Sequence, residues 1–314
     1  MEQKYVPISN NKHIAKDITE LIGGTPMIKI SKMSGPDDAA IYAKLEWYNI
    51  GGSVKDRMAL YIIEDAEKNG KLKDGKTIIE ATSGNTGISY AMIAAAKGYK
   101  IKIVLSESVS IERRKIIKAY GAELVLSPGD KGTGGAIELK RKIVAENRDK
   151  YVDLDQFSNH ANILAHYETT GKEILNQTGG DVDMIVMGLG TGGTGVGVSK
   201  RLKEHNKDIK TVGVIPKLGF SIQGLRNPKD TFPTELHDDK YFDEIIEIQG
   251  EEIHETLKTA RDLAKKDGLF VGMSSGAAMY VALKKAKELG KGKKIVVIFP
   301  DNGYKYLSTC LFED

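Results

Sequence analysis

Short, continuous apolar runs alternate along the chain with segments in which apolar and polar residues follow a helical period. The runs predict buried β-strands and the periodic segments predict amphipathic helices. The predicted strands are Met27–Ile30, Ile41–Leu45, Thr77–Ala81, Ile101–Leu105, Ala122–Leu126, Tyr151–Val152, Met184–Met187, Thr211–Ile215 and Ile295–Phe299. The predicted helices are one that starts at Lys55 and stops at Gly70, then Ile88–Ala96, Ile111–Tyr120, Ala136–Ala145, Ile163–Asn176, Gly195–Glu204, Ile253–Lys265 and Gly276–Leu289. This alternation predicts an α/β fold with parallel sheets covered on both faces.

The length of 314 residues predicts about two domains, with a boundary near Tyr151–Asn162. The stretch Pro216–Asp239 is rich in proline, glycine and charge, and it is long for a connection. Such a stretch is typical of a lid or a binding loop.

Composition narrows the function classes. Lysine and arginine exceed aspartate and glutamate by 46 to 43, and no long basic block is present, so nucleic acid is not an expected partner. The single cysteine, Cys310, excludes an internal disulfide, and we expect it to be a packing residue. The polar start Met1–Asp17 does not resemble a signal peptide, and the longest apolar run, Tyr90–Ala96, is too short for a membrane span. These features predict a cytoplasmic protein without a membrane partner.

Lys55 is the main candidate for chemistry. It lies among small residues in Gly51–Arg57 and precedes an apolar helix, so its ammonium is expected at a helix start in a closed site. Partial loss of water lowers the pKa of such a lysine, which then acts as a nucleophile or base and forms Schiff bases with carbonyls. A surface lysine is the simpler interpretation of this stretch alone. The arginine and lysine run at 113–115 is expected to be a solvated helix face.

Three glycine-containing loops follow predicted strands and precede helices, where parallel sheets bind ligands. Thr82–Gly87 offers hydroxyls, backbone N–H groups and a helix start for a carboxylate or phosphate. Gly188–Gly195 is the strongest anion site, because glycine lets the backbone approach a phosphate closely. Gly272–Gly276 is explained equally well as a ligand-binding loop and as a helix cap and turn. The six histidines show no metal-ligand spacing, so no metal is expected.

The second loop also contains Gly-x-Gly-x-x-Gly, the pattern of dinucleotide-binding proteins, which leaves a nicotinamide-dependent oxidoreductase as an alternative. That interpretation requires an acidic residue at the end of the next strand. The strand ends instead at Ile215–Lys217 without a carboxylate. The threonines of the loop favour a terminal monophosphate, whose oxygens need several donors.

Taken together, five motifs resemble the cysteine synthase (O-acetylserine sulfhydrylase) and cystathionine β-synthase family of fold-type II pyridoxal 5'-phosphate (PLP) enzymes. The resemblance extends from about Ile18 to Phe312. The motifs are Gly-Gly-Thr-Pro at 23–26, Gly-Gly-Ser-Val-Lys-Asp-Arg at 51–57, Thr-Ser-Gly-Asn-Thr-Gly at 82–87, Gly-Thr-Gly-Gly-Thr at 190–194 and Ser-Ser-Gly-Ala at 274–277. The tail Lys-Tyr-Leu-Ser-Thr at 305–309 also fits.

The resemblance implies two doubly wound α/β domains with PLP in the cleft between them, and a homodimer. A smaller, mobile domain would comprise residues 49–160, and a larger one residues 1–48 and 161–314. It implies that Lys55 is the Schiff-base lysine. The other cofactor-binding residues that it implies are Asn85 at the ring hydroxyl, Ser274 at the pyridine nitrogen, and Gly190, Thr191, Gly192, Gly193 and Thr194 at the phosphate. Those for the substrate carboxylate are Thr82, Ser83, Thr86 and Gln156.

The implied reaction makes L-cysteine by β-replacement, through an aminoacrylate intermediate, from an O-activated serine and sulfide. The alternatives on the same scaffold are a cystathionine β-synthase-like reaction and a cysteine-consuming reaction that releases sulfide. The chain departs from the family at Ile50, at Leu105–Glu107 and at His160, and the last two positions leave the donor open.

Arg226 in the long loop bears on the donor. One interpretation is a solvated loop arginine. In the other, which rests on similarity to the second isozyme class of cysteine synthases, Arg226 overhangs the β-substituent and binds the phosphate of O-phosphoserine.

Overall fold

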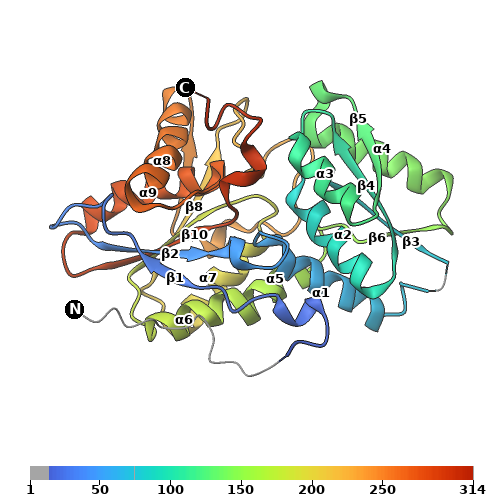
Figure 1. Cartoon of the computed structure of the whole chain (residues 1–314). Helices are drawn as coiled ribbons and strands as arrows, with labels where there is room; N and C mark the ends of the chain where they lie inside the picture. Colours follow the sequence, from blue (N-terminus) through green and yellow to red (C-terminus); the bar gives the residue numbers. More distant parts are fainter. Residues whose placement is uncertain (1–13, 74, 314) are drawn as a thin grey trace.

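The computed structural model describes residues 14–73 and 75–313 and contains two β-sheets that lie side by side (Figure 1). The larger sheet has six strands in the order β1 (Met27–Lys29), β2 (Ala40–Leu45), β10 (Lys294–Phe299), β7 (Met184–Gly188), β8 (Lys210–Pro216) and β9 (Glu244–Ile248). Within this sheet β1 pairs antiparallel with β2, and the other pairs are parallel. The smaller sheet is parallel throughout, in the order β5 (Glu123–Ser127), β4 (Lys100–Ser106), β3 (Thr77–Thr82) and β6 (Tyr151–Asp153).

Helices cover both sheets. They are α1 (Lys55–Lys68), α2 (Asn85–Lys97), α3 (Ile111–Ala119), α4 (Gly132–Glu146), α5 (Ala161–Ala165), α6 (Lys172–Thr178), α7 (Gly193–His205), α8 (Glu251–Asp267) and α9 (Met273–Leu289). A π-helix, η4 (His166–Gly171), joins α5 to α6. Short 3-10 helices are η1 (Ile18–Leu21), η2 (Glu46–Tyr48), η3 (Gly129–Lys131), η5 (Asp239–Tyr241) and η6 (Gly303–Tyr306). Among the described residues, no helix is long and apolar enough to cross a membrane.

Alternation along the strands explains the two-sided covering. In β10, Ile295, Val297 and Phe299 belong to one apolar cluster with residues of α8 and α9. Val296 and Ile298 point the other way, into a cluster with residues of α6 and α7. The smaller sheet is covered in the same manner, by α1–α3 on one face and α4 on the other. We call the four-stranded sheet with α1–α4 the small lobe and the six-stranded sheet with α6–α9 the large lobe.

The predicted α/β fold with two parallel-sheet units is confirmed, and the differences are local. Strand β9 was missed, and the single helix predicted at Ile163–Asn176 is interrupted by the π-helix. Cys310 is exposed, so the prediction that it packs in the interior is wrong. Most of the polar start Met1–Asp17 lies outside the described residues.

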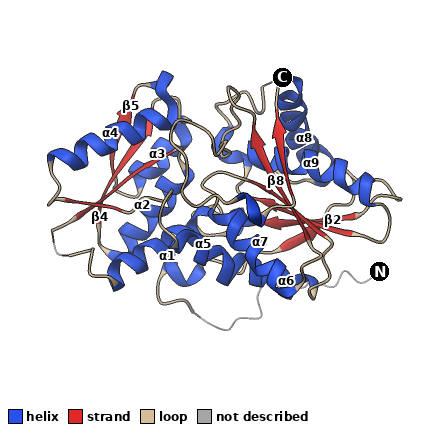
Figure 2. Cartoon of the chain, turned by 180° about the vertical axis from the view of Figure 1, so that it is seen from behind, coloured by secondary structure: helices blue, strands red, loops and turns tan. Residues whose placement is uncertain are grey.

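A buried ionic cluster joins α1 to the large lobe. The Arg57 guanidinium donates to Glu46 through Nε (2.7 Å) and to Glu173 through Nη1 (2.6 Å). Lys44 Nζ also lies 2.7 Å from Glu173, and the side chains of Lys44 and Arg57 are almost fully buried. Each charge is therefore compensated, as burial requires. Because Arg57 lies two residues after Lys55, the cluster fixes the start of α1. Helix α5 lies between α1 and α7 in the view from behind (Figure 2).

Candidate active site

A cavity of about 830 Å³ is lined by residues of both lobes and of the long loop after β8. Eight of the predicted site residues line it: Lys55, Ser83, Asn85, Thr86, Gln156, Gly190, Thr191 and Arg226. The other five are not among its lining residues: Thr82, Gly192, Gly193, Thr194 and Ser274. Segments far apart in the sequence thus meet at the carboxyl ends of the strands, where parallel sheets bind ligands.

Lys55 is the first residue of α1. The turn before it is held by the Val54 N–H, which donates to the Pro300 carbonyl at 2.9 Å, and by a bridge between Ser53 and Asp301. Burial lowers the pKa of Lys55 to about 8, against the opposing attraction of Asp301. The positive end of the helix dipole also disfavours an ammonium there. Near neutral pH a useful fraction of this amine is therefore unprotonated.

The loop at 82–87 places Asn85 beside this lysine. Gly84 has a φ of 130°, and a Cβ there would lie 2.2 Å from Arg113 Cδ, so the turn requires glycine. Asn85 Nδ2 donates to Asp301 Oδ2 at 2.7 Å, which fixes its amide. The Thr82 hydroxyl accepts the Gly84 N–H at 3.0 Å, so Thr82 closes the turn from inside.

Gln156 is held tightly at the opposite side of the same loop. Its Oε1 accepts from the Thr86 hydroxyl at 2.7 Å, and its Nε2 donates to the Ala81 carbonyl at 3.2 Å. The preceding residue, Asp155, has a φ of 43°, a left-handed conformation that is uncommon for a non-glycine residue. Backbone strain of this kind concentrates at ligand sites.

The loop at 188–195 forms an anion cradle at the start of α7. Gly192 has a φ of 93°, and a Cβ on Gly193 would lie 2.0 Å from Asn162 Oδ1. The same Asn162 side chain donates to Thr191 Oγ1 at 3.1 Å. N–H groups at a helix start, next to two threonine hydroxyls, suit a phosphate group.

His166 supports this cradle, and the sequence pattern did not reveal it. Its Nε2 lies 3.1 Å from Thr194 Oγ1, and its Nδ1 lies 2.9 Å from Thr170 Oγ1. Burial, with the nearby Lys55 and Arg57 charges, holds the pKa of His166 well below its usual range. The imidazole is therefore neutral and orients the Thr194 hydroxyl. A histidine that acts through hydrogen bonds leaves no metal-ligand spacing in the sequence, so the pattern of histidines did not indicate this role.

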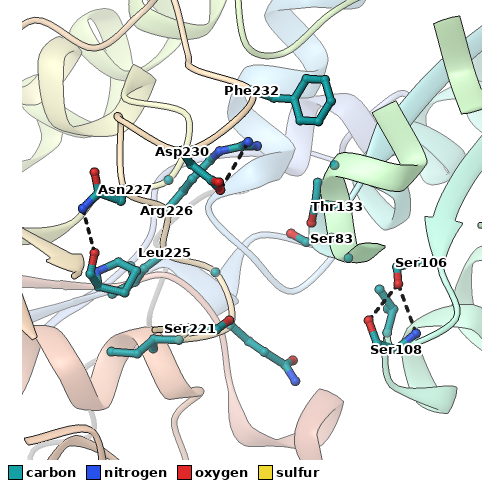
Figure 3. Close-up of a pocket in the computed structure, with 18 of the residues that line it drawn as sticks. Ser83, Ser106, Ser108, Thr133, Ser221, Leu225, Arg226, Asn227, Asp230 and Phe232 are labelled. Atoms are coloured by element: carbon teal, nitrogen blue, oxygen red, sulfur yellow. Dashed lines mark hydrogen bonds and ion pairs between the residues drawn. The ribbon is translucent and has the colours of Figure 1, made fainter. Parts of the chain in front are cut away.

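Arg226 lies in the cavity wall with its side chain only 11% exposed, so the interpretation as a solvated loop arginine is wrong. Its Nη2 lies 3.5 Å from Asp230 Oδ2, and its guanidinium carbon lies 5.3 Å from the Phe157 ring centroid. Its Nε has no hydrogen-bond partner among the described residues. Burial lowers the pKa of this guanidinium, with Asp230 opposing the shift. Figure 3 shows Arg226 and Asp230 opposite Ser83 and Thr133. The wall facing this arginine is thus rich in hydroxyls.

The expectation that residues 113–115 form a solvated helix face is wrong for Arg113. This residue is only 3% exposed, and it lines the cavity. Its Nη1 donates to Gln223 Oε1 at 2.9 Å, and its guanidinium covers the Tyr306 ring at 4.3 Å. Ser274 is also nearly buried, behind Gly224, whose Cβ would lie 3.3 Å from Ser274 Oγ. Both side chains depend on contacts between distant segments, which the local pattern does not contain.

These residues fit PLP. A partly neutral lysine suits its carbonyl, and a glycine-rich helix start with threonine hydroxyls suits its phosphate. A family model described as "Pyridoxal-phosphate dependent enzyme" matches residues 18–301. The chain belongs to this family of PLP-dependent enzymes. The match confirms the expected cofactor and decides against the nicotinamide alternative.

Similar proteins agree with this assignment. The chain is 46% identical over 304 residues to a cysteine synthase of Aquifex aeolicus, an alignment that covers 95% of this chain and 92% of that one. A crystal structure of cysteine synthase from Entamoeba histolytica matches with a TM-score of 0.91 at 40% identity, over 100% of this chain and 95% of that one. The crystal structure of a hydrogen sulfide-producing enzyme of Fusobacterium nucleatum matches with a TM-score of 0.86 at 40% identity. This match covers 94% of this chain and 99% of that one.

Proposed function

We propose that this enzyme makes L-cysteine by PLP-dependent β-replacement, from an O-activated serine and sulfide. The carrying observation is that Lys55 and the 82–87 loop face one cavity, directly beside the anion cradle. The 46% identity to a cysteine synthase over nearly the whole chain supports the same reaction. As part of the proposal, the enzyme is a cytoplasmic homodimer.

The residues have distinct tasks. PLP, when bound, supplies a carbonyl for Lys55 and a ring that withdraws electrons from the substrate Cα. Lys55 Nζ would remove the Cα proton of the substrate, a task that its pKa of about 8 permits. Ser83, Thr86 and Gln156 hold the substrate carboxylate.

Ser274 would meet the pyridine nitrogen with a neutral hydroxyl. A carboxylate at this position would keep that nitrogen protonated and make the ring a deeper electron sink. A hydroxyl makes a shallower sink, which favours loss of the β-substituent over transamination. Ser274 therefore directs the proposed enzyme toward β-replacement.

The proposal is tested on the purified holoenzyme. We expect a visible absorption band that disappears on borohydride reduction, and mass spectrometry should place the reduced adduct on Lys55. With sulfide and either O-acetylserine or O-phosphoserine, the protein should release L-cysteine. Colourless protein, an adduct on another lysine, or no cysteine from either donor contradicts the proposal. L-cysteine is assayed as a donor in parallel, because the similar Fusobacterium enzyme produces hydrogen sulfide.

For the donor, we propose O-phosphoserine recognised by Arg226. The guanidinium is mostly buried in the cavity wall, and its contact with Asp230 is long at 3.5 Å. Its buried Nε has no hydrogen-bond partner within the described part of the chain. A phosphate can accept two parallel hydrogen bonds from this guanidinium, whereas a neutral acetyl group gains little from the contact. Such a charge-assisted contact contributes about 1.5–3 kcal/mol, or roughly a tenfold to hundredfold preference.

We therefore expect Arg226→Ala to lower kcat/KM for O-phosphoserine by at least about tenfold, with little effect on O-acetylserine. Lys217→Ala is the matched control, because Lys217 is an exposed cation that lines the same cavity and donates to Gln249. Its effect should be small for both donors. Equal losses for both donors in Arg226→Ala, or a wild type inactive on O-phosphoserine, would rule out the phosphate contact.

A further inference from the structure

Asp301 lies where three site segments meet. It follows β10, is fully buried and forms a bridge with Ser53, two residues before Lys55. Its Oδ2 accepts from Asn85 Nδ2 at 2.7 Å, and its carbonyl accepts from the Gly272 N–H at 3.1 Å. Its side chain thus holds the asparagine loop, while its backbone pairs with the lysine turn and the serine loop.

The carboxylate occupies space that the fold keeps free. A Cβ on Gly272 would lie 2.1 Å from Asp301 Oδ1, so glycine is required opposite it. Oδ1 is buried and has no hydrogen-bond partner among the described residues. A buried acceptor without a partner is costly, and its retention points to a role for the charge itself.

Asp301 and Lys305 together determine how the Asn85 amide is turned. Lys305 Nζ donates to Asn85 Oδ1 at 3.1 Å and to the Gly52 carbonyl at 2.8 Å. With a cation at Oδ1 and an anion at Nδ2, the reverse orientation of the amide is unfavourable. Nδ2 has two hydrogens, so one N–H remains for a ligand in the cavity that Asn85 lines.

Other charges face this cluster from every neighbouring element. Arg113 Nη2 of α3 lies 3.9 Å from Asp301 Oδ2, and the Tyr306 hydroxyl of η6 donates to the same oxygen at 2.9 Å. Asp56 of α1 and Lys305 attract each other, and His166 of the π-helix is kept neutral by burial and by Lys55. Asp301 is therefore the anion whose attraction to the Lys55 nitrogen opposes the effect of burial.

We infer that Asp301 is a positioning residue and counter-ion for the Lys55–Asn85 pair. Its carboxylate favours the protonated state of the Lys55 nitrogen, including the nitrogen linked to the cofactor. With Lys305, it also directs one Asn85 N–H at the cofactor. The inference deepens the proposed function, because it rests on the binding of PLP at Lys55.

The test compares three holoenzymes by absorption spectra between pH 5 and pH 11. Asp301→Asn keeps the size and removes the charge, and Tyr306→Phe removes a hydrogen bond to the same oxygen and leaves the charge. We expect Asp301→Asn to lower the pH at which the protonated lysine–cofactor band is lost by about one unit or more. Tyr306→Phe should stay close to wild type. A folded Asp301→Asn protein with the wild-type titration overturns the counter-ion role, as does an equal shift in Tyr306→Phe.

Lys305→Gln is the second variant, in case Asp301→Asn does not fold. It releases Asn85 Oδ1 and leaves the Asp301 charge in place, so PLP affinity by equilibrium dialysis should fall several-fold without a lower titration midpoint. Unchanged affinity, or a midpoint lowered as in Asp301→Asn, overturns the inference. If the wild-type holoenzyme is coloured and the variants show the predicted shifts, but no cysteine is formed, the proposed reaction alone is refuted and the inference about Asp301 stands.

Discussion

Glu80 shows how a single buried carboxylate connects the core to the site. It is fully buried in β3, its Oε2 accepts the Gln156 N–H at 3.2 Å, and Lys140 Nζ lies 3.7 Å from its Oε1. Burial raises the pKa of Glu80 to about 7, with Lys140 opposing the shift. Glu80 therefore helps to position Gln156 through the backbone bond, and its carboxyl group titrates near neutral pH.

The sign of the resulting pH dependence is fixed. Because the pKa of Glu80 is raised in the folded state, its contribution to stability is complete below about pH 4.5 and is lost as pH rises through about 7. Glu80→Gln imitates the neutral form and does not lose this contribution. Between pH 5 and pH 8, the difference in free energy of unfolding between the variant and wild type should therefore shift in favour of the variant by about 1–3 kcal/mol. Urea unfolding at both pH values measures this. A pH-independent difference would contradict the assignment.

At the residue scale, the sequence revealed side chains that belong to contiguous motifs. Lys55, Asn85 and Thr191 stand in such motifs, and the structure places all three on the cavity. Arg113 and Asp301 were not found, because their burial depends on which helix or strand end meets which loop. A charged run carries no local sign that one of its members points inward. The functional roles of all these residues remain predictions.

At the scale of elements, the helices that border the site begin earlier than predicted. Helices α2, α7 and α9 start at Asn85, Gly193 and Met273, where the sequence pattern placed loops. The loop residues expected to bind ligands are therefore first-turn residues, whose N–H groups have no helical partner. Polar and glycine residues in these turns mask the helical period.

Gly193→Ala tests the fit of the anion cradle. Its Cβ would lie 2.0 Å from Asn162 Oδ1, so Asn162 or the start of α7 must move. We expect PLP affinity, measured by equilibrium dialysis, to fall by at least about tenfold because the cradle loses its donor geometry. In Gly129→Ala, the matched control, the nearest contact of the new Cβ is an ordinary 3.6 Å. Equal affinities in the two variants would contradict the proposed phosphate site.

Two elements escaped prediction for physical reasons. Strand β9, Glu244–Ile248, lies at a sheet edge and begins with an exposed glutamate, so it lacks the continuous apolar run of the central strands. The π-helix at His166–Gly171 has the same periodic pattern as an α-helix over so few residues. Central strands such as β7 and β10 were predicted because burial on both faces makes them apolar throughout.

At the scale of the molecule, contacts between α3 and the large lobe join the two units. Ser110 Oγ donates to the Lys305 carbonyl at 2.8 Å, and Arg113 donates to Gln223. Ser308 donates to Glu112 through its N–H (3.0 Å) and its hydroxyl (2.8 Å). We propose that residues 49–160 move as the smaller domain, and that these contacts hold it against the large lobe.

Glu112→Ala tests this proposal, because it removes both bonds to Ser308 without touching the cavity. The bonds are exposed, so the free energy of unfolding should change by less than about 1 kcal/mol. If the contact favours the closed arrangement, the KM for the serine donor should rise by roughly threefold to tenfold with kcat nearly unchanged. Hydrogen exchange in η6 should become faster at the same time.

The control for this variant is Glu123→Ala, which removes an ion pair between Glu123 and Lys102 (2.5 Å) that lies within the small lobe. This loss is also near the surface, but it leaves every contact of α3 with the large lobe in place. Its KM and its exchange in η6 should match wild type. If Glu112→Ala also leaves KM and exchange unchanged, the contact does not restrain the small domain. If both variants raise KM equally, the effect belongs to the stability of the small lobe and the proposed restraint is wrong.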